Sequence, residues 1–166
     1  MKWIFGACTL LFAAFAVVFG SETAANVDYD VVTVKRHLLL ETSDGEEQVS
    51  AGDRLHSGDA LRTGSRSKAE LEASDFAARF VIASKTRFEL AHDKPGVLLE
   101  VERGSLRAIF GKLTDGDQTE RLVTTPSAVL AVRGTEYGIE VKKNGDTSVA
   151  VFEGTVEVWD PRGVGD

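Results

Sequence analysis

Two carboxylates that each follow a glycine are the first candidates for chemistry in this sequence. Asp53 and Asp59 lie in two near copies of one phrase, Gly-Asp-Arg-Leu and Gly-Asp-Ala-Leu. A pair of carboxylates supports acid–base catalysis when the two groups act on one bond. Glycine tolerates positive φ and an aspartate bonds the backbone two residues on, so the same pattern is typical of a turn. We therefore predict that Gly52, Asp53, Gly58 and Asp59 form successive corners rather than a catalytic pair.

A second catalytic pattern, Ser-x-x-Lys, is present at Ser65 and Lys68. In penicillin-binding enzymes this motif needs the serine in a helical setting and a glycine after a later Lys-Thr pair. Arg87 stands where that glycine should be, and no helical periodicity surrounds Ser65. We exclude this chemistry.

Metal ligands are also poorly spaced. The histidines lie more than four residues apart, and the acidic loop lacks the ligand offsets of a calcium loop. These residues are His37, His56 and His92, and in the loop Asp115, Asp117 and Glu120. We expect no catalytic residue, no metal and no cofactor.

Arg133 is the remaining chemical candidate, because its guanidinium lies between an apolar run and a glycine. A recessed guanidinium can bind an anionic ligand, or it can bond carbonyls or a carboxylate at a crowded strand junction. A glycine inside a strand pattern usually marks a close approach of backbones. We favour the structural role for Arg133, Gly134 and Thr135.

Composition limits the classes of function. The chain has 166 residues, a formal net charge of −7, 43% hydrophobic and 27% charged residues. These values are typical of one folded domain, and the negative charge disfavours nucleic acid and anionic lipid as partners.

The first 25 residues resemble a targeting segment. Lys2 precedes an uncharged apolar run from Trp3 to Gly20, which is typical of a secretory signal peptide cleaved after Ala25 or Gly20. The alternative is an uncleaved membrane anchor, the only membrane contact we expect. Cys8 is the one cysteine, so the domain that we assign to residues 26–166 has no thiol chemistry. We expect this domain to be periplasmic or secreted.

The rest of the chain has the period of strands. Apolar and polar residues alternate in short runs between corners, and no long window outside the signal has helical spacing. Gly104 is expected to close one strand. Asn144-Gly145 predicts a type I′ hairpin with both residues at positive φ. The strand after it, residues 147–152, has apolar groups on both faces and is expected inside the sheet. This rhythm indicates an all-β fold and leaves sandwich, barrel and solenoid open.

The order of these corners resembles the FecR domain over about 110 residues. The most specific part is an Arg-Gly-Thr triplet between two strands, preceded by Thr-Pro and followed by Glu-Gly-x-Val. The residues that carry the resemblance include Gly52, Asp53, Gly58, Asp59, Thr63, Gly64, Thr125, Pro126, Arg133, Gly134, Thr135, Glu153 and Gly154.

The resemblance implies a periplasmic, β-rich, solenoid-like module without catalytic residues. The best-known members of the family sense the state of an outer-membrane iron transporter and signal through a membrane helix to a sigma factor regulator. Here only Met1 and Lys2 precede the apolar run, and seven residues follow Trp159. Phe76 also stands where an Asp-Gly turn is usual. We therefore expect a free-standing version.

Together these arguments predict a solenoid-like stack of short strands with hairpins, with a β-sandwich as the alternative. The expected function is a non-enzymatic envelope module that binds a protein partner, for example by accepting a strand at a free edge. Two alternatives stay open: a structural subunit of an envelope or secreted assembly, and an envelope polysaccharide hydrolase. The sequence identifies neither the partner nor the oligomeric state.

Overall fold

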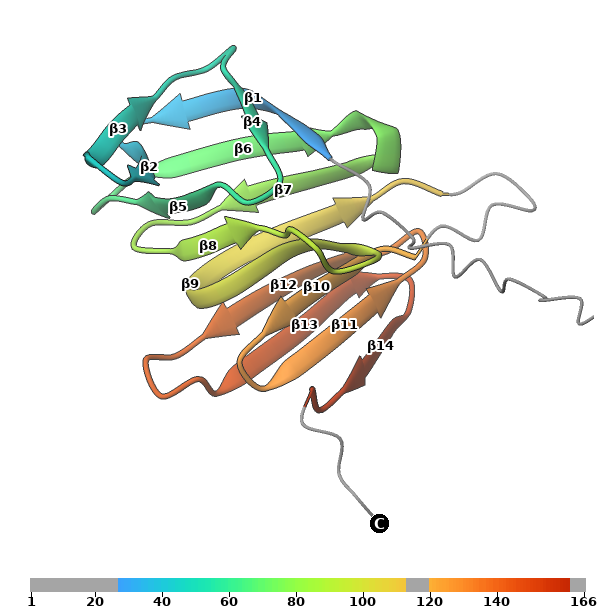
Figure 1. Cartoon of the computed structure of the whole chain (residues 1–166). Helices are drawn as coiled ribbons and strands as arrows, with labels where there is room; N and C mark the ends of the chain where they lie inside the picture. Colours follow the sequence, from blue (N-terminus) through green and yellow to red (C-terminus); the bar gives the residue numbers. More distant parts are fainter. Residues whose placement is uncertain (1–26, 113–119, 162–166) are drawn as a thin grey trace, which may run out of the picture.

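A computed structural model describes residues 27–112 and 120–161 of the chain. Within these ranges the regular structure is fourteen strands and one short 3₁₀ turn (Figure 1). The all-β prediction is confirmed. The predicted loop around Asp115 and Asp117 lies outside the described residues, as does the predicted signal segment.

The strands form one curled sheet with two layers that share a long strand, β9 (Val97–Phe110). The first layer has the order β4-β1-β6-β7-β9-β12-β13. Its strands are β1 (Asp28–Lys35), β4 (Arg54–His56), β6 (Lys68–Ala73), β7 (Ala78–Ile82), β12 (Glu136–Val141) and β13 (Thr147–Glu153).

The second layer has the order β3-β2-β5-β8-β9-β10-β11-β14. Its strands are β2 (Leu38–Thr42), β3 (Gly45–Val49), β5 (Ala60–Thr63), β8 (Arg87–Leu90), β10 (Leu122–Thr125), β11 (Ala128–Val132) and β14 (Val156–Trp159). All pairings are antiparallel except that of β10 with β9. Short strands are stacked as expected, but "solenoid" describes them only loosely, because hairpins and β9 replace a regular coil.

Gly104 bends β9 from one layer into the other. Residues 97–101 pair with β8 and β10, and residues 104–110 pair with β7 and β12. The φ of Gly104 is +100°, and a Cβ there would lie 2.5 Å from the Cα of Thr86. The expectation that the strand ends at Gly104 is therefore wrong: the glycine turns the strand because it tolerates this φ and leaves room for Thr86.

The core lies between the layers and draws on both. Tyr29 from β1 and Leu98 from β9 are buried, and the Tyr29 hydroxyl donates a hydrogen bond of 2.5 Å to the Leu98 carbonyl. Phe80, Phe110 and Tyr137 continue this core with ring centroids 5.8 and 6.1 Å apart. The alternation of strand residues thus places one apolar face of each layer inward.

The turn before β7 differs from a usual Asp-Gly corner, as Phe76 suggested. Residues Ser74–Phe76 form the 3₁₀ turn η1, and Ala77 follows with a φ of +47°. The hairpin between β6 and β7 still forms, with Ala73 opposite Ala78.

Candidate interaction site

Large exposed apolar side chains gather on two edge strands. Five such side chains are exposed among the described residues, and four of them lie on β13 and β14, at the lower end of the stack in Figure 1. They are Val151, Phe152, Val158 and Trp159, with exposed fractions of 49%, 60%, 53% and 45%. We call this region, β13 and β14 with these four side chains, the open end.

Strand register shows that the open end is an uncovered continuation of the core. Val151 lies opposite Tyr137, and Val158 lies opposite Leu130. Tyr137 and Leu130 are fully buried, and residues opposite each other in an antiparallel pair share a face. Val151 and Val158 therefore belong to the core face, yet half of each side chain is in solvent.

The opposite end of the stack is closed. Its edge strands, β3 and β4, turn Val49 and Leu55 inward, and these side chains are only 4% and 3% exposed. The exposed positions of β3 include Glu46 and Glu47, charges that discourage strand addition. Within residues 27–112 and 120–161, only the open end combines free strand edges with exposed apolar groups.

The predicted position of residues 147–152 is wrong. Among the described strands β13 pairs with β12 alone, so it is an edge strand rather than an interior one. Its outer apolar residue, Phe152, lies over the guanidinium of Arg107, whose carbon is 4.9 Å from the ring centroid. The same outer face has a groove of about 590 Å³ whose lining includes Gly138, Ala150 and Phe152. Apolar residues on both faces of β13 mark an exposed edge here, which sequence alternation cannot distinguish from a buried strand.

The Arg-Gly-Thr and Glu-Gly motifs meet at one corner of the open end. The Thr135 hydroxyl donates to the carbonyl of Thr155 at 2.8 Å. A Cβ on Gly154, whose φ is +85°, would lie 2.8 Å from the Gly134 carbonyl oxygen. Thr135 is buried, whereas the side chains of Arg133 and Glu153 are exposed. The close approach of backbones at Gly134 fits the expectation, but the Arg133 guanidinium is not recessed.

The Thr-Pro motif and the Asn-Gly turn meet at a second corner. The hydroxyls of Thr125 and Thr147 are 2.8 Å apart, and Ser127 Oγ donates to the Gly145 carbonyl at 2.8 Å. A Cβ on Gly145 would lie 3.4 Å from Cβ of Pro126. Hydrogen bonds between β10–β11 and the β12–β13 hairpin thus join the two layers where β13 begins.

The hairpin at Asn144 and Gly145 forms, but its predicted type is wrong. Gly145 has a φ of +88°, whereas Asn144 is not among the residues with positive φ. The Gly145 amide donates to the Lys142 carbonyl at 2.9 Å, and the Asn144 side-chain oxygen accepts from the Asp146 amide at 3.2 Å. One positive-φ residue after a turn suits a three-residue loop with a bulge instead of a type I′ turn.

The Gly-Asp phrases are placed at two turns. Gly52 and Gly58 have φ values of +93° and +95°. Asp53 accepts the Ser50 amide at 2.8 Å, and Asp59 accepts the His56 amide at 2.9 Å. Asp53 is exposed, so the two carboxylates do not form the buried pair that a hydrolase would need.

Thr63 and Gly64 hold neighbouring turns together. Thr63 is buried and its hydroxyl donates to the Ala83 carbonyl at 2.5 Å. The Gly64 amide donates to the His37 carbonyl at 3.1 Å, and a Cβ at Gly64 would lie 3.2 Å from Ser67 Oγ. These contacts are structural.

Across residues 27–112 and 120–161, no three His, Cys, Asp or Glu side chains are grouped as a metal site would require. In the same ranges no helix has the length and apolar character needed to cross a bilayer.

One comparison with known proteins identifies a family. The model of the family described as "FecR protein" matches residues 59–157, more than half of the 166-residue chain. No curated protein and no solved structure matches the chain.

Proposed function

The chain belongs to the FecR protein family, and from this premise we propose that it is an exported, non-enzymatic module that binds a protein partner at its open end. Family membership supports a regulatory or signalling role of this kind. The observation that carries the proposal is the contrast between a closed end with charged edges and an open end with exposed core-face valines.

The mode of binding follows from the edge strands. β13 and β14 each have one neighbour among the described strands, and along its other side each presents backbone groups that a partner strand can pair with. A partner strand added to such an edge gains main-chain hydrogen bonds, and apolar pockets select its side chains. Val151 and Val158 would be covered by the partner, and Glu153 and Glu157 beside them favour a partner with basic residues.

Crosslinking in intact cells tests this proposal. A photoreactive amino acid at Phe152 or Trp159 is expected to give one defined adduct with an envelope protein. Val32 is a matched control site, because it is the fifth exposed apolar residue, 40% exposed, and lies on β1. The adduct should disappear in a Val158→Lys variant that retains its circular dichroism spectrum. Equal adducts from position 32, or none from the open end, would contradict the proposal.

The structural-subunit alternative has a distinct outcome. If the adduct at position 152 is a second copy of this chain, and the purified protein dimerises in a way that Val158→Lys abolishes, the open end assembles copies of the chain instead. Sedimentation velocity of both proteins decides between these two roles.

A further inference from the structure

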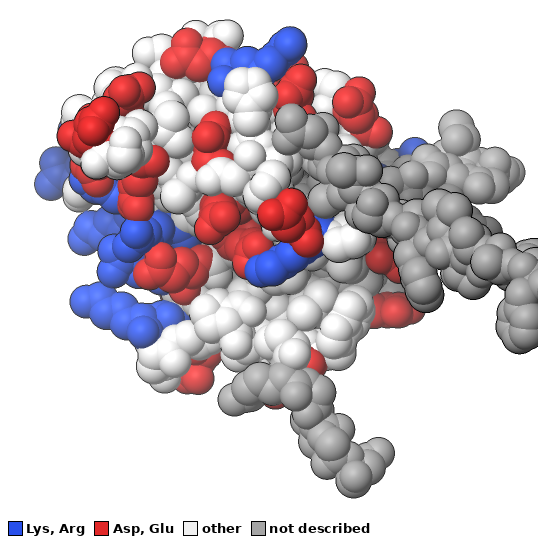
Figure 2. Space-filling model, in the orientation of Figure 1, with Lys and Arg blue, Asp and Glu red and all other residues white. Residues whose placement is uncertain are grey.

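A row of stacked turns forms a basic edge along one side of the molecule. We define the basic edge by six exposed cations. Four lie in turns, Lys68 begins β6, and Arg103 lies at the bend of β9; the four in turns are Arg36, Arg66, Lys85 and Lys143. Figure 2 shows blue side chains gathered on the left side, where Figure 1 places the ends of β1, β7 and β12. This concentration is unexpected in a chain whose formal net charge is −7.

Hydrogen bonds and close backbone contacts connect these turns into a continuous row. The Gly64 amide donates to the His37 carbonyl at 3.1 Å, and the Lys85 amide donates to the Gly64 carbonyl at 3.1 Å. Gly104 packs against Thr86, and on the other side it lies opposite Val141. The row crosses five neighbouring strands, β1, β6, β7, β9 and β12. Because adjacent strands lie about 4.8 Å apart, it is about 19 Å long.

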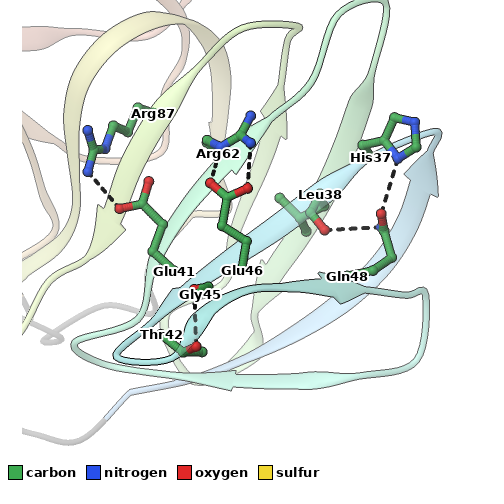
Figure 3. A network of polar contacts seen from close by, with 9 residues as sticks. All are labelled: His37, Leu38, Glu41, Thr42, Gly45, Glu46, Gln48, Arg62 and Arg87. Carbon is green, nitrogen blue, oxygen red and sulfur yellow. Dashed lines mark hydrogen bonds and ion pairs between the residues drawn. The ribbon is translucent and has the colours of Figure 1, made fainter.

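The cations of the basic edge are not neutralised by neighbouring carboxylates. Six other Lys and Arg side chains of the described residues form ion pairs, but none of the six edge cations does. Figure 3 shows the contrast on the adjacent face, where Arg62 bonds Glu46 at 2.5 Å and Arg87 bonds Glu41 at 2.6 Å. Arg62 accordingly holds the pKa of the Glu46 carboxyl below its ordinary value.

Three of the edge cations occupy a strained backbone conformation. Arg36, Arg66 and Lys85 have φ values of +71°, +55° and +59°. An L side chain is disfavoured there, and glycine adopts the same φ without that penalty. Cationic side chains at these positions therefore carry a backbone cost, a pattern found at functional sites.

Two hollows separate the cations at the lower part of the edge. Lys85, Arg103 and Lys143 share a hollow of about 310 Å³, and Arg103 and Lys143 also line one of about 430 Å³. Glu102, on the rim of the second hollow, has Arg87 as its partner at 3.1 Å. The hollows can receive anionic substituents between the cations.

We propose that the basic edge binds a linear acidic polysaccharide, whose regularly repeated carboxylates follow the row of turns. The edge is narrow, and exposed acidic residues such as Glu140 flank it, so a broad anionic membrane would meet repulsion beside it. The six edge residues include no aromatic side chain, which single-stranded nucleic acid needs for base stacking. The turns also present no strand edge to a protein. This binding is independent of the partner site at the open end.

Titration of the purified protein with alginate oligosaccharides at low ionic strength tests the proposal. Lys68→Glu, Arg103→Glu and Lys143→Glu are combined in one variant, because none of these residues has positive φ. The control combines Arg54→Glu, Arg79→Glu and Lys94→Glu, exposed cations away from the edge with the same change in net charge. We expect at least about a tenfold loss of affinity in the edge variant and a much smaller loss in the control.

Other ligands and a second variant test whether the basic edge prefers an acidic polysaccharide to anionic lipid or nucleic acid. Neutral dextran should not bind, and anionic phospholipid vesicles and single-stranded DNA should bind more weakly than alginate at equal charge concentration. Replacing Arg36, Arg66 and Lys85 together by glycine should weaken alginate binding without lowering the thermal midpoint, because backbone strain is removed. Absence of alginate binding, equal losses in the edge and control variants, or tighter binding of vesicles or DNA would overturn the proposal.

Discussion

Tyr29 and Tyr137 are buried in the same core, but only one of their two hydroxyls has a hydrogen-bond partner among the described residues. Tyr29 donates to the Leu98 carbonyl, whereas the buried Tyr137 hydroxyl has no hydrogen-bond partner among the described residues. Removing the Tyr29 hydroxyl loses a buried hydrogen bond, although the Leu98 carbonyl still accepts from the Ala91 amide at 3.2 Å. Removing the unsatisfied hydroxyl of Tyr137 relieves a desolvation cost. We expect Tyr29→Phe to lower the free energy of unfolding by about 1.5 kcal/mol and Tyr137→Phe to leave it unchanged or raise it by about 1 kcal/mol. Urea unfolding of the two variants measures this; equal losses would contradict the assignment.

The same tyrosines make stability depend on alkaline pH. Burial raises the pKa of both phenols above the ordinary value. A group whose pKa is higher in the folded state contributes stability that is present below the unfolded pKa, about 10, and is lost above it. We expect the free energy of unfolding to fall by about 2.7 kcal/mol per pH unit above that value, because two protons remain bound only in the folded state. The double variant Tyr29→Phe, Tyr137→Phe, measured beside the parent, should lack this component of the slope.

At the scale of elements, the bend of β9 depends on Gly104. A Cβ there would lie 2.5 Å from the Cα of Thr86, a backbone atom that cannot move aside alone. Gly52 has a similar φ of +93° but nothing within 4 Å of its Cβ position. We expect Gly104→Ala to cost about 3 kcal/mol or more and Gly52→Ala about 1 kcal/mol, the strain of positive φ alone. Thermal and urea unfolding of the pair measure the difference; similar costs would show that crowding at Thr86 is unimportant.

Strand positions were predictable because alternation and turn residues act locally. The hairpin at Asn144 and the corners at Gly52 and Gly58 depend on neighbours in sequence, and each is found where the pattern indicated. The layer to which a strand belongs depends on distant contacts, so neither the passage of β9 through Gly104 nor the edge position of β13 was visible. The open end was missed for that reason: Val151 has the sequence context of a core valine, and it is exposed because no further strand of the described residues lies beside β13.

At the scale of the molecule, ion-paired and unpaired cations lie on different surfaces. Paired cations such as Arg62 and Arg87 lie on the outer face of the second layer, and six exposed cations without an ion pair form the basic edge. Net charge alone disfavoured nucleic acid and anionic lipid as partners and gave no sign of a basic edge. The basic edge results from stacking, which brings residues as distant as Arg36 and Lys143 into one row; their separate positions in the sequence look like ordinary solvated turns.

The cooperative unit extends beyond the residues that the family model matches. That match begins at residue 59, but β1 to β4 precede it and supply five buried side chains: Tyr29, Val31, Leu38, Val49 and Leu55. At about 2 kcal/mol each, their burial contributes about 10 kcal/mol, comparable with the whole stability of a typical domain. A chain that starts at residue 59 would also leave β5 and β6 without their partners β2 and β1.

We therefore expect residues 59–161 alone to show no cooperative unfolding transition by circular dichroism, whereas residues 27–161 retain one. Residues 27–154, which lack β14, are the matched control, because no side chain of β14 is fully buried. Their loss uncovers the edge of β11, the partly buried contact of Val156 with the core and the hydrogen bond from Thr135 to Thr155. This control should unfold cooperatively with a reduced midpoint. A folded fragment that starts at residue 59 would show that β1 to β4 cover a core that is already complete without them.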